Sequence, residues 1–535
     1  MSRPTALRLL ALALVAGVAA DLLFRGHASG LNVPLWILLV VVVGTLVAGR
    51  DGLDRLDPWD AWLAPAAVLL GGFVALRTDP ALVLVDLLLA TAAAGAWLVA
   101  LGGRPVTRGA VEAVAMSAAM LCGATVIGLI PVLRAARPLT RSLDGRLRVH
   151  PQLVPVLRGL AIAVPVLLVF AALFAAADAI FARAIDALTS IDIDLADAPE
   201  RAVVVLVVGW VVGGALILAT GDWRAILGDG PGDAGRPSDR APLWGPDFAP
   251  GAPPPAPPAA PARSLGAAVA RPVTGLRIGE VEASVLLIAV DVLFAVFVVL
   301  QVAYLFGGLD TLAASGQTYA SYARRGFFEL LTVAGLAGAL VAGLEVTVRR
   351  RSRPYLVATL VLLALTALIL ASSFLRLRLY QDAYGWTELR FWVVLSIGWL
   401  AASLVVLAVL VARDRSRWVL HALAILGLVT VAVANVLGPQ AFSTDRNLAR
   451  ALDPSLIPPD GRVGLDADYL GSLGDDAVPA MVAAYASLGA ADRAALAAVL
   501  TERRRSLAQD ESVRGWPAWN VARTRAQEAL ARWQP

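Results

Sequence analysis

Acidic side chains inside apolar stretches are the first residues of this sequence that could do chemistry. Asp291 lies in the middle of a long apolar run with Gln301 further along it, and Asp86 occupies a similar position in an earlier run. Because a charge inside a membrane-spanning helix is costly, such residues tend to face a cavity or a partner. Either carboxyl group could hold a proton or a cation. The alternative is structural, as a helix–helix hydrogen bond or an ion pair with an arginine such as Arg158.

Two groups of Tyr, Arg and Glu side chains flank later apolar runs. In the first group, Arg325 and Glu329 are spaced to pair at i,i+4 on a helix. In the second group, residues at intervals of four would share one helical stripe, provided that Gly385 does not end the helix. The two groups could form an external polar rim or a substrate vestibule, or they could belong to an interfacial belt of aromatic and charged residues. Their members are Tyr322, Arg324, Arg325, Glu329, Arg376, Tyr380, Tyr384, Glu388 and Arg390.

Several classes of chemistry are excluded or disfavoured by the residues that are absent. The 45 basic residues are all arginine, so neither a Walker A lysine nor a Schiff-base lysine exists. Cys122 and three widely separated histidines make a Cys/His metal site unexpected. No G-x-S-x-G, H-E-x-x-H or dinucleotide fingerprint occurs. We therefore expect no metal, no cofactor and no nucleic acid, since the net charge of +4 arises largely from loops.

The composition requires lipid as a solvent for most of the chain. Hydrophobic residues make up 59% of the sequence, charged residues 16%, and the mean hydropathy is +0.73. These values predict an all-α polytopic transmembrane helix bundle of about 12 spans. The apolar runs of spanning length are 6–24, 33–48, 61–76, 80–101, 110–133, 155–177, 201–219, 280–306, 326–347, 355–375, 389–411 and 418–437.

A Pro/Ala/Gly-rich segment divides the membrane region. It predicts an N-terminal transmembrane half at 1–220, a linker at 221–279, a C-terminal transmembrane half at 280–437 and a small helical soluble tail at 438–535. Within the tail, Asp475 and Asp476 are expected to cap a helix that begins near Ala477.

The distribution of arginine predicts the orientation of the chain. By the positive-inside rule, the arginine-rich loops around 134–148, 224–277, 349–353 and 413–417 are cytoplasmic, which puts the tail outside. Arg3 and Arg8 conflict with this orientation, because five spans before Arg134 would place the N-terminus outside as well. The exclusive use of arginine and the abundance of Ala and Gly suggest a bacterial origin. The predicted location is thus the bacterial cytoplasmic membrane.

Motifs in the second half of the chain are similar to a bacterial membrane family called domain of unknown function 4173, with its relative 4153. The resemblance covers about 280–535 and implies that these residues form one site, but it implies no activity. The matching segments are 322–330; 384–390; Asn435, Pro439, Ala441 and Phe442; Arg446 and Asn447; 468–470; 476–480; and Trp519 and Asn520.

The sequence is compatible with three functions. The leading hypothesis is a non-enzymatic sensor, regulator or envelope scaffold that contacts another membrane or envelope protein through 438–535. The first alternative is a transporter or channel that uses Asp291. The second is a membrane-embedded transferase with Glu329, Glu388 or Asp291 as the base.

Overall fold

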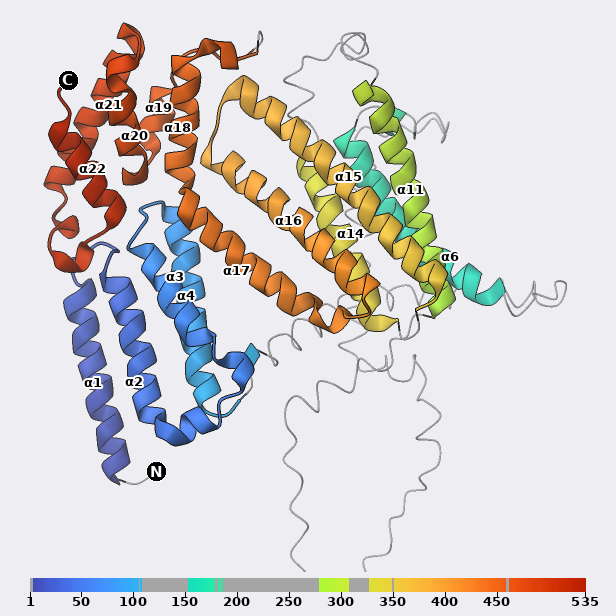
Figure 1. Ribbon diagram of the computed structural model, residues 1–535, viewed down its shortest axis with the longest axis horizontal. Helices are drawn as coiled ribbons and strands as arrows, with labels where there is room; N and C mark the ends of the chain where they lie inside the picture. Colours follow the sequence, from blue (N-terminus) through green and yellow to red (C-terminus); the bar gives the residue numbers. More distant parts are fainter. Residues whose placement is uncertain are drawn as a thin grey trace, which may run out of the picture.

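Helices are the only regular structure in the described part of the chain, which confirms the predicted all-α class. The structure is a computed structural model that describes residues 3–104, 106–107, 153–178, 181–183, 185, 279–306, 327–348, 351–458 and 461–535. The apolar helices are α1 (Arg3–Phe24), α2 (Asn32–Asp54), α3 (Leu63–Val74), α4 (Pro80–Leu101), α6 (Leu153–Ala177), α11 (Glu280–Phe306), α14 (Phe327–Thr347), α15 (Arg353–Tyr384), α16 (Glu388–Ala412) and α17 (Val419–Leu437) (Figure 1).

Seven of the described helices are long and apolar enough to cross a membrane. They are α2, α4, α6, α11, α14, α15 and α16, and an eighth span results if α17 and the helix after it count as one bent span. The predicted number of about 12 is therefore not confirmed, and the runs 110–133 and 201–219 lie outside the described residues. Large apolar side chains such as Leu46, Val299 and Ile425 point outward and are 65–73% exposed. Such a surface needs lipid around it, so the chain is an integral membrane protein.

The apolar helices pack around two separate cores. One core joins α2, α3 and α4, and the other joins α6, α11, α14, α15 and α16. α17 contacts both, because its Val419 is buried in the second core while Leu428 and Val431 pack against the first. We call α1 to α4 the first bundle, and α6, α11, α14, α15 and α16 the second bundle. α17 therefore bridges the two bundles.

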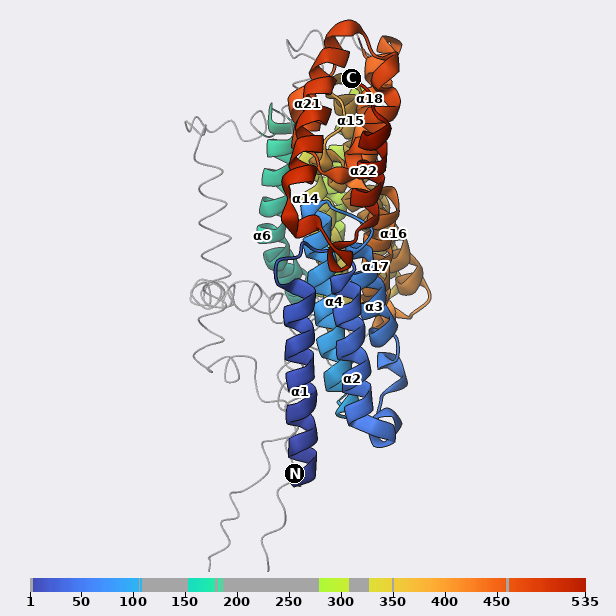
Figure 2. The same ribbon diagram turned by 90° about the vertical axis from the view of Figure 1, so that its left-hand side faces the viewer.

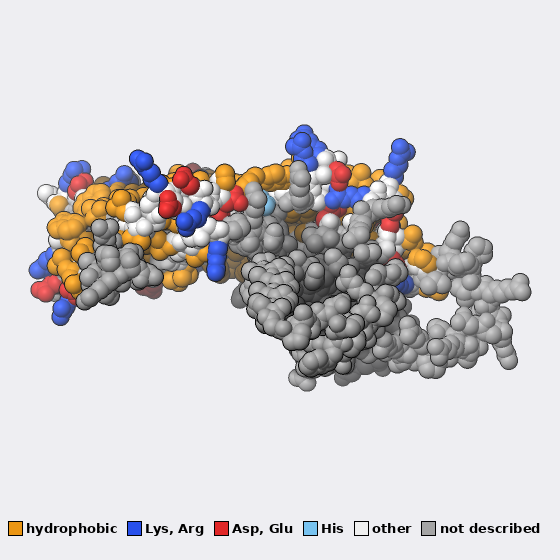
Figure 3. All heavy atoms as spheres, turned by 90° about the horizontal axis from the view of Figure 1, so that it is seen from below, with side chains coloured by type: hydrophobic (Ala, Val, Ile, Leu, Met, Phe, Trp, Pro, Cys, Tyr) orange, Lys and Arg blue, Asp and Glu red, His pale blue; other side chains and the backbone are white. Residues whose placement is uncertain are grey.

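The helix ends in the first bundle bear on the position of the N-terminus. α1 begins at the end away from the tail, and its last turn leads to the turn on which the tail rests (Figures 1 and 2). At the end of the molecule away from the tail, the Trp59 ring packs against the rings of Trp418 and His421, with centroid distances of 5.0 and 5.8 Å. The described helices thus bring the start of α1 to the same end as the arginine-rich turn around 413–417. Figure 3 views the molecule from that end, where arginine side chains are visible among hydrophobic ones.

The tail begins at a sharp break in the helix. α17 ends at Leu437 and α18 (Pro439–Leu452) leaves at an angle of 51°. Gly438 between them has a φ of 68°, a left-handed value that favours glycine, and Pro439 starts the new helix without needing a backbone donor.

The tail has a hydrophobic core of its own. α19 (Ala467–Ser472), α20 (Val478–Ala484), α21 (Ala490–Gln509) and α22 (Val521–Arg532) pack around side chains that include Leu470, Met481 and Leu496. Asp475 and Asp476 lie in a short 3-10 turn, Asp475–Ala477, and their side chains bind arginines instead of capping α20. The predicted cap is therefore wrong, because an arginine partner satisfies each carboxylate.

Candidate functional site

Three turns at one end of the apolar helices contact the tail. They are the turns α1–α2, α3–α4 and α15–α16, and we call them together the docking surface. Two of these turns come from the first helix bundle and one from the second, so a single tail contacts both bundles.

The α3–α4 turn binds the tail through Asp476. Arg77 Nη1 donates to Asp476 Oδ1 over 3.0 Å, and the Thr78 backbone N–H and hydroxyl donate to Asp476 Oδ2 over 2.7 and 3.0 Å. The Asp476 side chain is 2% exposed and that of Arg77 is 17% exposed. A carboxylate this deeply buried needs such partners, since it has lost its water.

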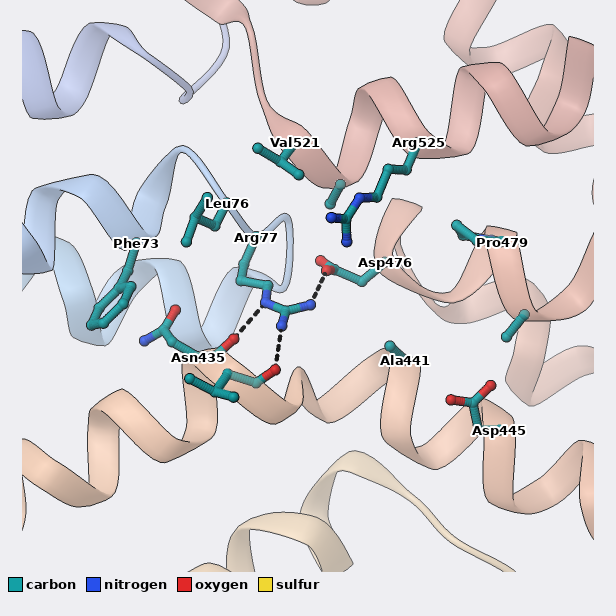
Figure 4. A pocket seen from close by; sticks show the side chains of 13 residues that line it. Phe73, Leu76, Arg77, Asn435, Ala441, Asp445, Asp476, Pro479, Val521 and Arg525 are labelled. Carbon is teal, nitrogen blue, oxygen red and sulfur yellow. Dashed lines mark hydrogen bonds and ion pairs between the residues drawn. The ribbon is translucent and has the colours of Figure 1, made fainter.

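Arg77 also caps the C-terminal end of α17. Its Nε donates to the Asn435 carbonyl and its Nη2 to the Val436 carbonyl, both over 2.7 Å (Figure 4). The last carbonyls of a helix have no partner within the helix, and the planar guanidinium supplies donors in several directions. One side chain from the first bundle thus connects α17 and the tail.

Asn520 makes the second contact with the same turn. Its Nδ2 donates to the carbonyls of Val74 and Arg77 over 3.0 and 2.9 Å, while its Oδ1 accepts from the Arg523 N–H at the start of α22. The next backbone N–H groups, of Val521 and Ala522, donate to further carbonyls at the end of α3. Asn520 therefore caps α22 and the end of α3 together.

The α1–α2 turn meets the tail mainly through its backbone. The Ala28 N–H donates to the Ser512 carbonyl and the Leu31 N–H to the Trp519 carbonyl, over 2.8 and 2.9 Å. A Cβ at Gly30 would lie 2.6 Å from the Trp519 oxygen, so the close approach requires glycine at this position.

The α15–α16 turn binds α18 and α19. Asn447 Oδ1 accepts from the Trp386 N–H and Asn447 Nδ2 donates to the Trp386 carbonyl, over 2.7 and 2.8 Å. The Glu388 N–H donates to the Tyr469 hydroxyl over 2.9 Å. Gly385 has a φ of 80°, and a Cβ there would lie 2.6 Å from Asn447 Oδ1. Many segments that carry the family resemblance therefore lie together on the docking surface.

Asp79 is a buried acid next to these contacts. It caps α4, accepting from the Ala81 and Leu82 N–H groups over 2.9 and 3.1 Å. Burial raises the pKa of its carboxyl above 3.8 and the negative charge of Asp476 acts in the same direction, while the two backbone N–H groups and Arg77 oppose them. Burial likewise raises the pKa of the Tyr469 phenol.

The two predicted intramembrane acids have different surroundings. Asp86 is fully buried, and its Oδ1 accepts from Asn435 Nδ2 over 3.0 Å. Because the Asn435 carbonyl accepts from Arg77, Asp86 adjoins the docking contacts. Asp291 lies in α11, and its buried Oδ1 has no hydrogen-bond partner among the described residues.

The predicted stripe from Arg376 to Glu388 does not form, because Gly385 ends α15 and Glu388 begins α16. Arg376 is buried and pairs with Asp178 over 3.0 Å. Tyr380 and Tyr384 lie with centroids 4.9 Å apart, and the Arg390 guanidinium sits 4.3 Å from the Tyr380 ring.

The other predicted group is described only at Glu329, which is half-buried in the first turn of α14. Tyr322, Arg324 and Arg325 lie outside the described residues.

Sequence reasoning missed a second polar cluster at the opposite end of the molecule. Arg351 Nη2 lies 2.5 Å from Glu345 Oε2, and the Tyr355 hydroxyl donates to Glu345 Oε1 over 3.0 Å. Arg351 also pairs with Asp414, which ties the α14–α15 turn to the α16–α17 turn. Among the described residues, no group of three or more Cys, His, Asp or Glu side chains could hold a metal ion.

One comparison with known proteins gives a match. The family model described as Domain of unknown function (DUF4153) matches residues 64–484. The match reaches well into the first half of the chain, beyond the segment 280–535 that carries the resemblance, and it supports the relative 4153 without supporting the finer assignment to 4173. No curated protein and no solved structure matches the chain.

Proposed function

The chain belongs to the family of Domain of unknown function (DUF4153), and we propose that it is a non-enzymatic membrane sensor or scaffold that acts through its docked tail. The observation that carries the proposal is the pairing of Arg77 with Asp476, because this one contact joins the first bundle, the end of α17 and the tail. A tail fixed to both bundles responds to any change in their relative position.

The proposal includes a location. We place the protein in the cytoplasmic membrane of a bacterium, as a multi-pass protein with its tail on the extracytoplasmic side. Supporting this orientation, the arginine-rich turn around 413–417 and the start of α1 lie at the end opposite the tail. The partner is then a membrane or envelope protein that binds 438–535.

The first test is reconstitution. Purified protein in liposomes that contain a proton-, sodium- or potassium-sensitive dye should move the matching ion no faster than empty liposomes under an imposed gradient. Flux above that background would contradict a sensor or scaffold role. The Asp476→Asn variant serves as a comparison, since loss of docking should not create flux either.

The second test is a photo-crosslinker at Arg505, which lies on an exposed part of α21. In intact cells it should capture one recurrent envelope protein. The capture should weaken in Asp476→Asn, which loosens docking, and remain in Asp468→Asn, which alters an exposed carboxylate elsewhere in the tail. Equal capture in both variants would show that the docked state has no role.

A transporter or channel is the second candidate, and it is favoured by the buried Oδ1 of Asp291, which has no hydrogen-bond partner among the described residues. It requires Asp291→Asn to abolish a flux that the wild-type protein shows, with unchanged folding. The reconstitution described above decides between the two candidates.

A further inference from the structure

A cavity of about 460 Å³ opens where the first bundle, α17 and the tail meet. Its walls come from the end of α3, the end of α17, the start of α18 and the rest of the tail (Figure 4). Because α3 ends at Val74 and α17 ends at Leu437, the cavity lies at the level where apolar helices give way to polar turns. A pocket of this size at this level suits an amphipathic ligand.

The lower wall of the cavity is apolar and continues along α17. Phe73 of α3 and Leu76 of the turn after it line this wall, and Val436 lines it from α17. Val436 is 75% exposed, and the outward-facing Val433, Val429 and Ile425 extend the same apolar surface away from the tail. A hydrocarbon chain lying on this surface would remain in contact with apolar side chains along its length.

The upper wall carries charges of both signs. Arg77 and Asp476 neutralise each other. Arg525 and Asp445, both exposed, form no salt bridge within the described residues, and the charge that acts on Asp445 is that of its neighbour Arg446. Figure 4 shows Arg525 reaching from α22 toward Arg77 and Asp476, whereas Asp445 projects from α18. The cavity therefore offers one uncommitted cation and one uncommitted carboxylate.

We propose that this cavity binds the headgroup of a zwitterionic aminophospholipid. Its phosphate lies beside Arg525, whose guanidinium matches phosphate oxygens, and its ammonium group lies beside Asp445. Its acyl chains follow Phe73 and Val436 into the membrane. A purely anionic headgroup would leave Asp445 facing like charge, and a headgroup without N–H donors would leave it without a hydrogen bond.

Native mass spectrometry of the purified full-length protein tests the proposal. The protein is incubated with equal amounts of phosphatidylethanolamine, phosphatidylglycerol and phosphatidylcholine that carry the same acyl chains. Preferential retention of phosphatidylethanolamine is expected. Equal retention of all three lipids, or a preference for phosphatidylglycerol, would overturn the proposal.

Variants then locate the site. Arg525→Gln should lower retention of phosphatidylethanolamine about fivefold, whereas Arg532→Gln, an exposed arginine on the same helix, should leave it unchanged. Asp445→Asn should remove the preference for phosphatidylethanolamine over phosphatidylglycerol. Wild-type retention in Arg525→Gln would overturn the assignment.

Two further measurements distinguish an intact lipid in this cavity from a lipid bound elsewhere and from a headgroup bound alone. Ala480 lines the cavity, so Ala480→Trp should exclude the lipid, and undiminished retention would show that the lipid binds at another place. Soluble glycerophosphoethanolamine should compete poorly, because it lacks the chains that contact the apolar wall. Competition as strong as that of the intact lipid would contradict a lipid site.

Discussion

The guanidinium of Arg77 lies 3.0 Å from the carboxylate of Asp476, although the two residues are 399 positions apart in the sequence. Arg77 belongs to the turn that follows α3, and Asp476 belongs to the tail. Both groups are largely removed from solvent, so neither can exchange its partner for water without disturbing the fold. The pair is therefore the natural place to loosen the tail without altering its own core.

Replacing Asp476 by alanine should release the tail. The change leaves the Arg77 charge and the Thr78 N–H without their acceptor, and removing one member of a buried pair costs about 3 kcal/mol or more. Hydrogen–deuterium exchange should accelerate in α20 and α22 while the α15 interior keeps its protection. Asp468→Ala, at an exposed position of α19, is the control and should change neither. Unaltered exchange in Asp476→Ala would contradict the structural role of the pair.

Gly438→Ala should destabilise the same junction by a different route. A left-handed φ costs an alanine about 1–2 kcal/mol, and the new Cβ would lie 2.5 Å from Arg77 Nη1. The expected result is a lower thermal unfolding midpoint and faster exchange in α18. Gly398 makes a matched control, since it lies inside α16 with open space around its Cβ position. Gly398→Ala should keep or raise the midpoint, because alanine favours helix.

Two substitutions at Asn520 separate its roles. Asn520→Asp keeps an acceptor for the Arg523 N–H but can no longer donate to the Val74 and Arg77 carbonyls. Asn520→Ala loses both functions. If docking depends on the donated bonds, both variants should speed proteolysis between α18 and α19 to a similar extent, while only alanine lowers the protection of the first turn of α22. Wild-type proteolysis in Asn520→Asp would mean that the donated bonds contribute little.

The sequence predicted the helices better than the site. The length of the apolar runs located α4, α11, α14 and α16 closely, because lipid selects long hydrophobic runs. The family resemblance singled out Asn435, Asp476 and Asn520, but it could not supply Arg77, because the groups that its guanidinium binds all lie more than 350 positions away. No local pattern contains that information.

Two errors in the sequence-based prediction have identifiable physical causes. Tyr384 and Glu388 are spaced by four, which places them together only if the helix continues, and the left-handed φ of Gly385 ends it. Asp475 and Asp476 resemble a helix cap in sequence. They bind Arg503 and Arg77 instead, because those arginines approach from segments far away in the chain.

Asp79 should make stability depend on pH. Since burial raises the pKa of its carboxyl, the folded protein holds this proton more tightly than the unfolded chain does. The stability that the protein gains from this tighter proton binding is therefore fully present below pH 3.8. It is lost as the pH rises through the raised pKa of Asp79.

Asp79→Asn preserves the helix cap, because Asn caps as well as Asp. Its thermal midpoint should exceed that of wild type at about pH 7.5, and the two should converge near about pH 4. Asp453→Asn, which alters an exposed capping residue, should track wild type at both values. A midpoint below wild type at the higher pH would show that the Asp79 charge is stabilising.

Cysteine labelling tests the orientation of the chain. With Cys122 replaced by alanine, one new cysteine is placed at Ser472 in the tail or at Asp54 at the other end of the first bundle, both exposed. A membrane-impermeant maleimide should label Ser472→Cys in intact cells and Asp54→Cys only after lysis, because arginine-rich turns remain in the cytoplasm. The reverse pattern would place the docking surface in the cytoplasm, and its partner would then have to be sought there. Labelling of both sites before lysis would mean that the described helices do not separate the two ends across a membrane.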